Sequence, residues 1–312
     1  MTEPQDPTVD SFDDVTLLPC RRDPHSPTGH SFGAFDRNGA NIPAFAHPWC
    51  AARPETPDAH RHPGRFVYGG LLMDHFGHFL LEAMARLWFI RAHPELPVLW
   101  HEIDLAVPHA PWPGWRQEAW HLLGLDQHRH HVIHRPMRFG RVVVPQPGFS
   151  TAEGLHPLQA AALAVVPTPT PRPHAGQCVW LSRGALPERF GRLLGEATLE
   201  RHLVEHGWTV LRPETLGVAA QANVFAGAAT VAGFAGSAFH SVLLCAAPRA
   251  RLCILRRPAI RTVHYDHVAR ARGLDLTHLE VPLRPTGPLN AWTTFEIADP
   301  DAAAGAIFAA VA

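Results

Sequence analysis

The stretch CVWLSRGALPERFGRLLGEATLERHLVEHGWTVLRP, residues 178–213, contains the pattern that decides the fold. A short apolar run predicts a strand over 178–183, and a second one predicts a strand over 208–213. Between them, apolar residues at helical spacing predict a helix over 196–207, closed by Gly207. Two buried strands joined through a helix are typical of a parallel sheet. The segment therefore predicts an α/β unit.

The same alternation continues toward the C-terminus. Helices are expected over 215–228 and 236–247, and strands over 230–233 and 251–257. This rhythm predicts a Rossmann-like sheet. A further strand and a terminal helix starting near Asp299 complete the series, and the helix is a candidate to pack back on the N-terminal part of the chain.

The N-terminal part predicts a second α/β domain with a largely parallel sheet. Its first 65 or so residues lack periodicity and are interpreted as short strands and loops. A Pro/Thr-rich segment, 166–177, reads as a stiff linker, so the expected domains are 1–165 and 178–312. The remaining expected elements are a strand and turn at 65–70, a long buried helix over 73–93 capped by Asp74, strands at 97–100 and 104–108, a helix over 114–125, and strands at 130–134 and 141–146.

Composition limits the classes of function. The formal net charge is -1, so the chain lacks the basic field of a nucleic-acid binder. Its five cysteines are widely spaced, which argues against a disulfide framework or a zinc ribbon. The polar N-terminus does not resemble a signal peptide, and no apolar run is long and clean enough to span a bilayer. We expect a cytoplasmic protein with membrane contact only at a surface.

Ionisable groups are concentrated in the apolar run 69–90. His75, His78 and Glu82 fall at i, i+3 and i+7, on one face of the expected helix. One interpretation is a metal site, although the spacing differs from that of zincins. A second is general base chemistry by a histidine or by Asp74, since imidazole titrates near neutrality. A third is structural, with Glu82 and Arg86 paired and the histidines bonded to backbone.

A second group of candidates follows the strand 178–183. Arg183, Arg189 and Arg192 lie in one loop at the carboxyl end of that strand, where open α/β sheets bind ligands. Three converging guanidinium groups would suit a pyrophosphate. Farther along, Gly236 and Ser237 open a predicted helix whose backbone N–H groups would attract a phosphate. Close packing and ordinary surface charge are the structural alternatives for these residues.

Taken together, these segments resemble glycosyltransferase family 61, a group found in bacterial capsule clusters. The resemblance runs from about residue 66 to residue 256, and the ordered set of motifs is more specific than any one of them. Two positions depart from the family pattern: Gly195 stands where members often have Asn, and Ala235 where many have His, for which His240, one turn later, is a candidate substitute. The matching residues are His78, Glu82 and Arg86, then Arg183, Arg192 and Glu196, then Gln221, and last Gly233 and Gly236.

The resemblance implies an inverting, metal-independent glycosyltransferase in a GT-B arrangement, acting in surface polysaccharide synthesis. It implies a nucleotide-sugar donor, a glycan or lipid-linked acceptor, no cofactor, and a cytoplasmic location that can include the inner membrane surface. His78 is the expected base and Asp74 the second choice, with His75 and Glu82 orienting it. The expected donor residues are Arg183, Arg189, Arg192, Glu196, Gln221, Gly236, Ser237 and His240.

Three alternatives are weighed against this function. A transferase with a metal-bound diphosphate is disfavoured, because neither DxD-like stretch, at 12–14 or at 299–301, follows a convincing nucleotide-binding strand and the second resembles a helix cap. A metal-dependent hydrolase would use His75, His78 and Glu82. A catalytically degenerate scaffold would be consistent with Gly195 and Ala235.

Overall fold

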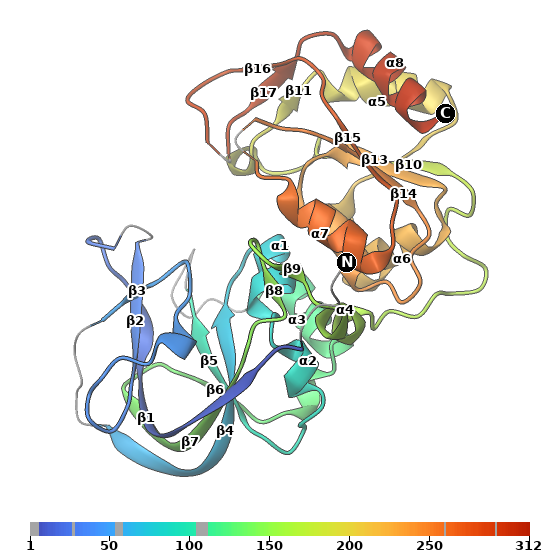
Figure 1. Cartoon of the computed structure of the whole chain (residues 1–312). Helices are drawn as coiled ribbons and strands as arrows, with labels where there is room; N and C mark the ends of the chain where they lie inside the picture. The colour runs from blue at the N-terminus through green and yellow to red at the C-terminus, as the bar shows by residue number, and fades with distance from the viewer. Residues whose placement is uncertain (1–5, 27–28, 54–58, 104–111, 259, 291) are drawn as a thin grey trace. The chain divides into compact units, whose positions relative to one another are not determined.

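The computed structural model describes residues 6–26, 29–53, 59–103, 112–258, 260–290 and 292–312. The chain divides into two compact units, Met1–Leu163 and Ala164–Ala312, each with its own sheet (Figure 1). The strand expected at 104–108 lies outside the described residues. Both units mix helices and strands, so the chain has an α/β fold.

The first unit contains a seven-stranded mixed sheet. β1 pairs antiparallel with β2 and with β7, whereas β7, β4, β5 and β6 pair parallel. The predicted largely parallel sheet is found except around β1, which pairs antiparallel on both sides; its connection to β2 is too short for the crossover helix that a parallel pair needs. The strand order is β3 (Ala51–Ala52), β2 (His30–Phe35), β1 (Val9–Arg22), β7 (Met137–Pro145), β4 (His60–Leu72), β5 (Val98–Glu102) and β6 (His130–Val132).

The first 65 residues are not mainly loops. β1 is 14 residues long and β4 already begins at His60. Along β1, Val15 and Leu17 are buried while Asp13 and Asp14 face arginines on the neighbouring strands. The buried part of β1 is Val15 with the run 17–19, and both ends of the strand are exposed.

The long helix expected over 73–93 is broken. It consists of α1 (Phe76–His78), a π-helical segment η2 (Phe79–Ala83) and α2 (Leu87–Ile90). The cause is the fully buried side chain of Gln159, whose Nε2 donates to Met84 O at 2.7 Å and whose Oε1 accepts from Trp88 N at 3.1 Å. Those two backbone groups would bond to each other in an uninterrupted α-helix, so the inserted amide replaces that turn.

Short elements complete the first unit. They are η1 (Pro43–Phe45), α3 (Gly114–Leu122), η3 (Leu125–Gln127), β8 (Phe149–Ser150), β9 (Gly154–Leu155) and α4 (Pro157–Leu163).

The second unit contains a five-stranded sheet that is parallel throughout. From β10 the chain first adds β12 on one side and then β13, β14 and β15 on the other, which puts a topological switch point between β10 and β13. Ligands of such sheets bind at the carboxyl ends of the strands beside the switch point. The strands are β10 (Cys178–Leu181), β12 (Thr209–Leu211), β13 (Thr230–Phe234), β14 (Arg251–Leu255) and β15 (Leu276–Leu279).

Helices and a small sheet surround these strands. Trp180, Phe234 and Leu255 from the sheet pack in one core with residues of α5 and α8. Asp299 caps α8, because its side chain accepts from Asp301 N and Ala302 N, which confirms the cap predicted there. The elements are η4 (Glu188–Phe190), β11 (Leu193–Leu194), α5 (Glu196–Glu205), η5 (Pro213–Thr215), α6 (Val218–Gly227), η6 (Ser237–Leu243), α7 (Val263–Arg272), β16 (Leu283–Pro285), β17 (Phe295–Ile297) and α8 (Pro300–Val311).

Two general features concern the whole described chain. All five cysteines are free thiols, and Cys20 Sγ lies 3.6 Å from Cys50 Sγ. Within the described residues, no helix has both the length and the apolar character that crossing a bilayer demands.

Candidate functional site

His78 and Glu82 form a hydrogen-bonded pair in the first unit. His78 Nδ1 lies 2.9 Å from Glu82 Oε1, and 36% of the His78 side chain is exposed. Trp49 Nε1 donates to the other carboxylate oxygen, Glu82 Oε2, at 2.6 Å. Burial acts to raise the pKa of Glu82. The hydrogen bond from His78, the charge of His78 and the hydrogen bond from Trp49 together lower it by more, so the pKa of Glu82 lies below its usual value. Glu82 is thus an anionic partner for the imidazole.

A carboxylate can only accept hydrogen bonds, so the proton of a neutral His78 sits on Nδ1. The lone pair of Nε2 is then available to take a proton from a hydroxyl group. This is the arrangement in which a carboxylate orients a histidine base.

Two neighbours of the pair come from a loop that the sequence did not single out. Trp49 packs edge-on against the His78 ring, with ring centroids 5.2 Å apart. The pKa of His47 is lowered to about 4, chiefly by burial, which the charge of Glu82 only partly offsets. Trp49 and Glu82 are 33 residues apart in the chain, and no local pattern connects them.

His75 has a structural position. It is the N-cap of α1, and its Nδ1 accepts from His78 N at 3.5 Å, a long hydrogen bond. Its ring lies 4.7 Å from that of His78. Asp74 is therefore not the N-cap predicted from the sequence.

Arg86 does not form the ion pair with Glu82 that the structural interpretation proposed. Its Nε donates to Pro145 O at 2.8 Å, and its guanidinium group lies 5.1 Å from the centroid of the Tyr68 ring. The broken helix explains the difference, since residues four apart share a face only in a continuous α-helix.

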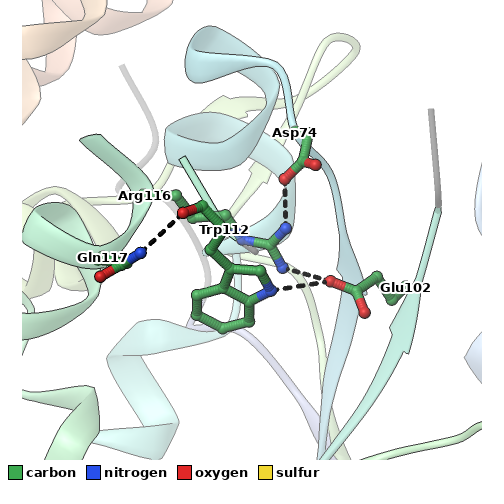
Figure 2. Close-up of polar contacts among 5 residues, drawn as sticks. All are labelled: Asp74, Glu102, Trp112, Arg116 and Gln117. Carbon is green, nitrogen blue, oxygen red and sulfur yellow. Dashed lines mark hydrogen bonds and ion pairs between the residues drawn. The ribbon is translucent and has the colours of Figure 1, made fainter. Parts of the chain in front are cut away.

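Asp74 is occupied by a buried ion pair (Figure 2). Arg116 is 1% exposed, and its guanidinium group bonds to Asp74 and, at 2.7 Å, to Glu102. The indole of Trp112 lies 3.8 Å from the guanidinium carbon and donates to Glu102 at 3.2 Å. Asp74 neutralises a cation that has almost no access to water, and breaking such a pair is costly. This makes His78 the better candidate for the base.

A metal site receives no support from the geometry. Throughout the described ranges, no three His, Cys, Asp or Glu side chains come together as ligands of a metal ion would. Both oxygens of Glu82 already accept hydrogen bonds, from His78 and from Trp49. His78 and Glu82 are arranged as a hydrogen-bonded pair, and His75 bonds to the backbone of His78.

Arg183 follows β10, at the switch point of the second sheet. Its backbone N–H donates to Glu196 Oε1 at 3.0 Å, and its Nη2 donates to Phe190 O at 2.8 Å. Burial lowers the pKa of Arg183, and the charge of Glu196 opposes that effect. Its Nε is buried and has no acceptor among the residues that the structure describes.

Arg257 is a second buried guanidinium group at the same edge, directly after β14. It is 4% exposed, and one of its nitrogens, Nη1, donates to Ala235 O at 3.3 Å. Its Nε and Nη2 are buried without an acceptor in the described part of the chain. Burial, followed by the charge of Arg183, lowers the pKa of Arg257 to about 10. Arg183 and Arg257 are thus two neighbouring cations with unused N–H donors in a region shielded from water, and together they form a site for an anion.

Glycines bring the backbone close to these arginines. A Cβ on Gly191 would lie 2.7 Å from Thr293 O and 3.0 Å from Arg257 Nη2, and φ is +73°. Only glycine fits this close turn of the η4 loop. A Cβ on Gly236 would lie 2.7 Å from Arg183 Nη1, so the Gly-rich turn lies directly against Arg183.

The helix expected after Gly236 is shorter than predicted. Ser237 opens η6, a 3-10 helix of seven residues, which offers a weaker dipole than an α-helix would. His240 Nδ1 donates to Ser237 O, and the ring of His240 stacks on Tyr265 with centroids 5.2 Å apart. Tyr265 in turn donates to Gly236 O at 3.1 Å. These contacts hold the turn at Gly236 in place, and the guanidinium groups of Arg183 and Arg257 supply the positive charge of the site.

Glu196 and Gln221 hold the loops of the site. Glu196 is 1% exposed, and burial raises its pKa to about 7, against the bond from Arg183 N. Gln221 donates to Pro213 O and Leu216 O and accepts from Ser241 Oγ. All the polar atoms of Gln221 are thereby engaged in linking η5, α6 and η6.

Arg189 and Arg192 do not join Arg183 in the buried group. Arg189 is exposed and lies over the Phe190 ring at 4.7 Å, and Arg192 is half-exposed, 3.7 Å from Glu188. The expected convergence of three arginines in one loop is therefore wrong. Arg257 is the second cation beside Arg183 instead. The rule that identified Arg183, a polar residue just past the end of a parallel strand, could also have found Arg257.

The fold and the site define an α/β protein with a cationic site at the carboxyl edge of a parallel sheet. A family model described as Glycosyltransferase 61 matches residues 76–253, more than half of the chain. The chain belongs to this family, which confirms the resemblance, and it is a glycosyltransferase enzyme.

The chain was also compared with curated protein sequences and with solved structures. No curated protein sequence matches the chain. A solved structure that matches is the bacterial iron-containing dodecameric glycosyltransferase TibC from enterotoxigenic E. coli H10407. It is 10% identical over 84% of this chain and 86% of that chain, with a TM-score of 0.31, too low to support a structural argument.

Proposed function

We propose that the protein is an inverting glycosyltransferase of the GT-B type that needs no metal ion and takes its sugar from a nucleotide sugar. The observation that carries the proposal is that the half-buried Arg183 and the buried Arg257 hold buried N–H groups with no acceptor in the described part of the chain, at the carboxyl edge of the second sheet. A diphosphate offers several acceptor oxygens and negative charge, which is what these donors lack.

The arginines would act on the leaving group. As the bond between the anomeric carbon and the diphosphate oxygen breaks, negative charge grows on the diphosphate, and fixed guanidinium groups in a dry site stabilise that charge. No metal ion is needed for this role if both cations reach the phosphates.

His78 would act on the acceptor. The acceptor oxygen forms a bond to the anomeric carbon from the face opposite the diphosphate, and its proton passes to His78 Nε2. Glu82 stabilises the resulting imidazolium through the 2.9 Å hydrogen bond. The family resemblance supports a glycan or lipid-linked acceptor and a role in surface polysaccharide synthesis on the cytoplasmic side of the membrane.

The alternative of a catalytically degenerate scaffold rested on Gly195 and Ala235, and Gly195 no longer supports it. Gly195 adopts φ +89°, a left-handed conformation that Gly and Asn share, so a glycine there keeps the backbone that an asparagine would give. Ala235, the other departure, still contributes its carbonyl oxygen to Arg257.

The test is donor binding by the full chain, read as thermal stabilisation across a panel of nucleotide sugars. A donor at a hundred times its Kd stabilises the folded protein by about 2.7 kcal/mol, a shift of roughly 5 °C or more. Arg183→Ala and Arg257→Ala should abolish the shift, and Arg251→Ala should keep it, because Arg251 lies at the opposite end of β14 and pairs with Asp275. If no donor shifts the melting temperature, the scaffold function is correct instead.

A further inference from the structure

Trp49 is a large exposed side chain held in a fixed orientation beside His78. It is 40% exposed, yet its Nε1 is bonded to Glu82 and its ring packs against the imidazole. An exposed indole with one rotamer fixed by a 2.6 Å hydrogen bond has already lost its conformational freedom before any ligand arrives.

The backbone around Trp49 is fixed as well. His47 and Cys50 close a tight turn, in which Cys50 N donates to His47 O at 3.0 Å. Trp49 N donates to His47 Nδ1 at 3.3 Å. Pro48 occupies the second position of this turn, where its ring presets the backbone angle. The loop therefore presents Trp49 rigidly.

The exposed part of Trp49 is apolar. Indole has a single polar hydrogen, and that hydrogen is directed to Glu82. What remains for a ligand is carbon surface with the negative face of the ring quadrupole. A ligand that matches it needs a flat patch of C–H groups with slight positive charge and hydroxyl groups around the rim.

We propose that Trp49 is the stacking platform of an acceptor subsite, and that the acceptor is a pyranose sugar whose C–H face packs on the indole. This rests on the proposed function, since it names the substrate class of the His78 site. A pyranose that stacks on Trp49 presents ring hydroxyl groups at its edge, and His78 lies 5.2 Å from the indole centroid. One hydroxyl can then reach Nε2 while the ring stays stacked. A lipid chain would match the apolar surface but would bring no hydroxyl group to the histidine.

The experiment measures sugar binding without any transfer reaction. Methyl glycosides of glucose, galactose, mannose and N-acetylglucosamine, in both anomeric forms, are tested against the full chain by saturation-transfer NMR, alone and with nucleoside diphosphates present. At least one should bind, with saturation concentrated on the C–H protons of one face. Trp49→Ala should weaken that binding at least tenfold.

Trp49→Phe separates the two roles of the side chain. Both variants lose the hydrogen bond to Glu82, but Phe keeps an aromatic face, so it should bind the sugar better than Ala does. Leu158→Ala is the control, because Leu158 is also an exposed apolar side chain, at 46%, but lies on α4 of the same unit and should not affect sugar binding. Circular dichroism melts check that each variant is folded.

The outcomes distinguish this inference from the proposed function. Sugar binding that depends on Trp49, without any donor binding, would leave the acceptor subsite standing and reject the transferase mechanism. Binding that is equal in wild type, Trp49→Ala and Trp49→Phe overturns the stacking platform even if transfer is observed. The same holds if no glycoside binds, or if only alkyl chains such as octanol give saturation signals.

Discussion

His78 and Glu82 are joined by a 2.9 Å hydrogen bond between Nδ1 and Oε1, and a second oxygen of Glu82 is held by the indole of Trp49. The carboxylate is therefore fixed from two sides. It can hold the imidazole in one tautomer and one orientation, which a mobile carboxylate could not do.

Replacing either member of this pair should lower kcat much more than donor affinity. His78→Ala removes the base, and a loss of about 10²–10⁴-fold is expected. Glu82→Gln can donate to Nδ1 and so favours the tautomer with hydrogen on Nε2, which leaves no acceptor for the substrate proton. Steady-state kinetics and donor thermal shifts measure the two effects. Glu95→Gln, which alters an exposed carboxylate 3.4 Å from His93, is the control and should be silent.

Arg257→Met should stabilise the ligand-free protein while abolishing donor binding. The wild-type side chain keeps a cation buried with two nitrogens that lack acceptors, and replacing such a charge by an apolar side chain of similar length commonly gains about 1–4 kcal/mol. Urea unfolding of the ligand-free protein measures the change. Arg251→Met, at the other end of the same strand, should show no gain. A less stable Arg257→Met protein would mean that the arginine holds the fold and not a ligand.

The second unit was largely predictable from sequence, and the first was not. In the second unit the inner strands β10, β13 and β14 are buried on both faces, and each strand of the sheet is separated from the next by a helix, so periodicity and order alone indicate a parallel sheet. In the first unit β1 carries the polar residues Asp13, Asp14 and Thr16, and one of its two partners, β7, lies more than a hundred residues away. Pairing over that separation leaves no local signal.

Long-range contacts also limited how much of the candidate site could be predicted from the sequence. Arg183 follows a strand and Gly236 begins a helix, so the general rules for α/β sheets identified them, whereas Glu196 was predicted only from the family resemblance. Trp49 acts through one long-range hydrogen bond and Gln159 through two, and nothing in their neighbouring sequence marks them. The break in the helix around His78 likewise depends on Gln159, a residue 75 positions from Met84.

Tyr68→Phe should destabilise the protein without changing donor affinity. Tyr68 donates to His101 Nδ1 at 2.9 Å, and His101 Nε2 donates to Leu18 O at 2.9 Å, so His101, fully buried, is neutral. Burial lowers its pKa to about 4. Removing the hydroxyl leaves a buried nitrogen without a donor and should cost about 1–3 kcal/mol in urea unfolding. Equal stability of variant and wild type would contradict this network.

Glu196→Gln should change how stability depends on pH. The pKa of Glu196 is about 7 in the folded protein against 4.5 for the free side chain, so between these values the folded state holds a proton that the unfolded state has lost. Its contribution to stability is therefore complete at low pH, falls as pH rises from about 4.5 to 7, and is a penalty above that range. Glutamine is neutral at every pH. Relative to wild type, Glu196→Gln should gain stability at pH 8 compared with pH 5, as measured by denaturant unfolding, and a constant difference would refute the raised pKa.

Gly195→Asn should be tolerated, whereas Gly195→Val should not. The position has φ +89° at the N-cap of α5, and a Cβ there would meet only Pro300 and Ile297 at 3.4 Å or more, so conformation and not space decides the outcome. Asparagine adopts the left-handed region readily, while a β-branched residue loses roughly 1–2 kcal/mol there. Donor binding should be unchanged in Gly195→Asn, because a Cβ at this position meets Ile297 and Pro300, not Arg183. If asparagine instead alters donor affinity, position 195 contacts the ligand, and the glycine found there changes donor specificity.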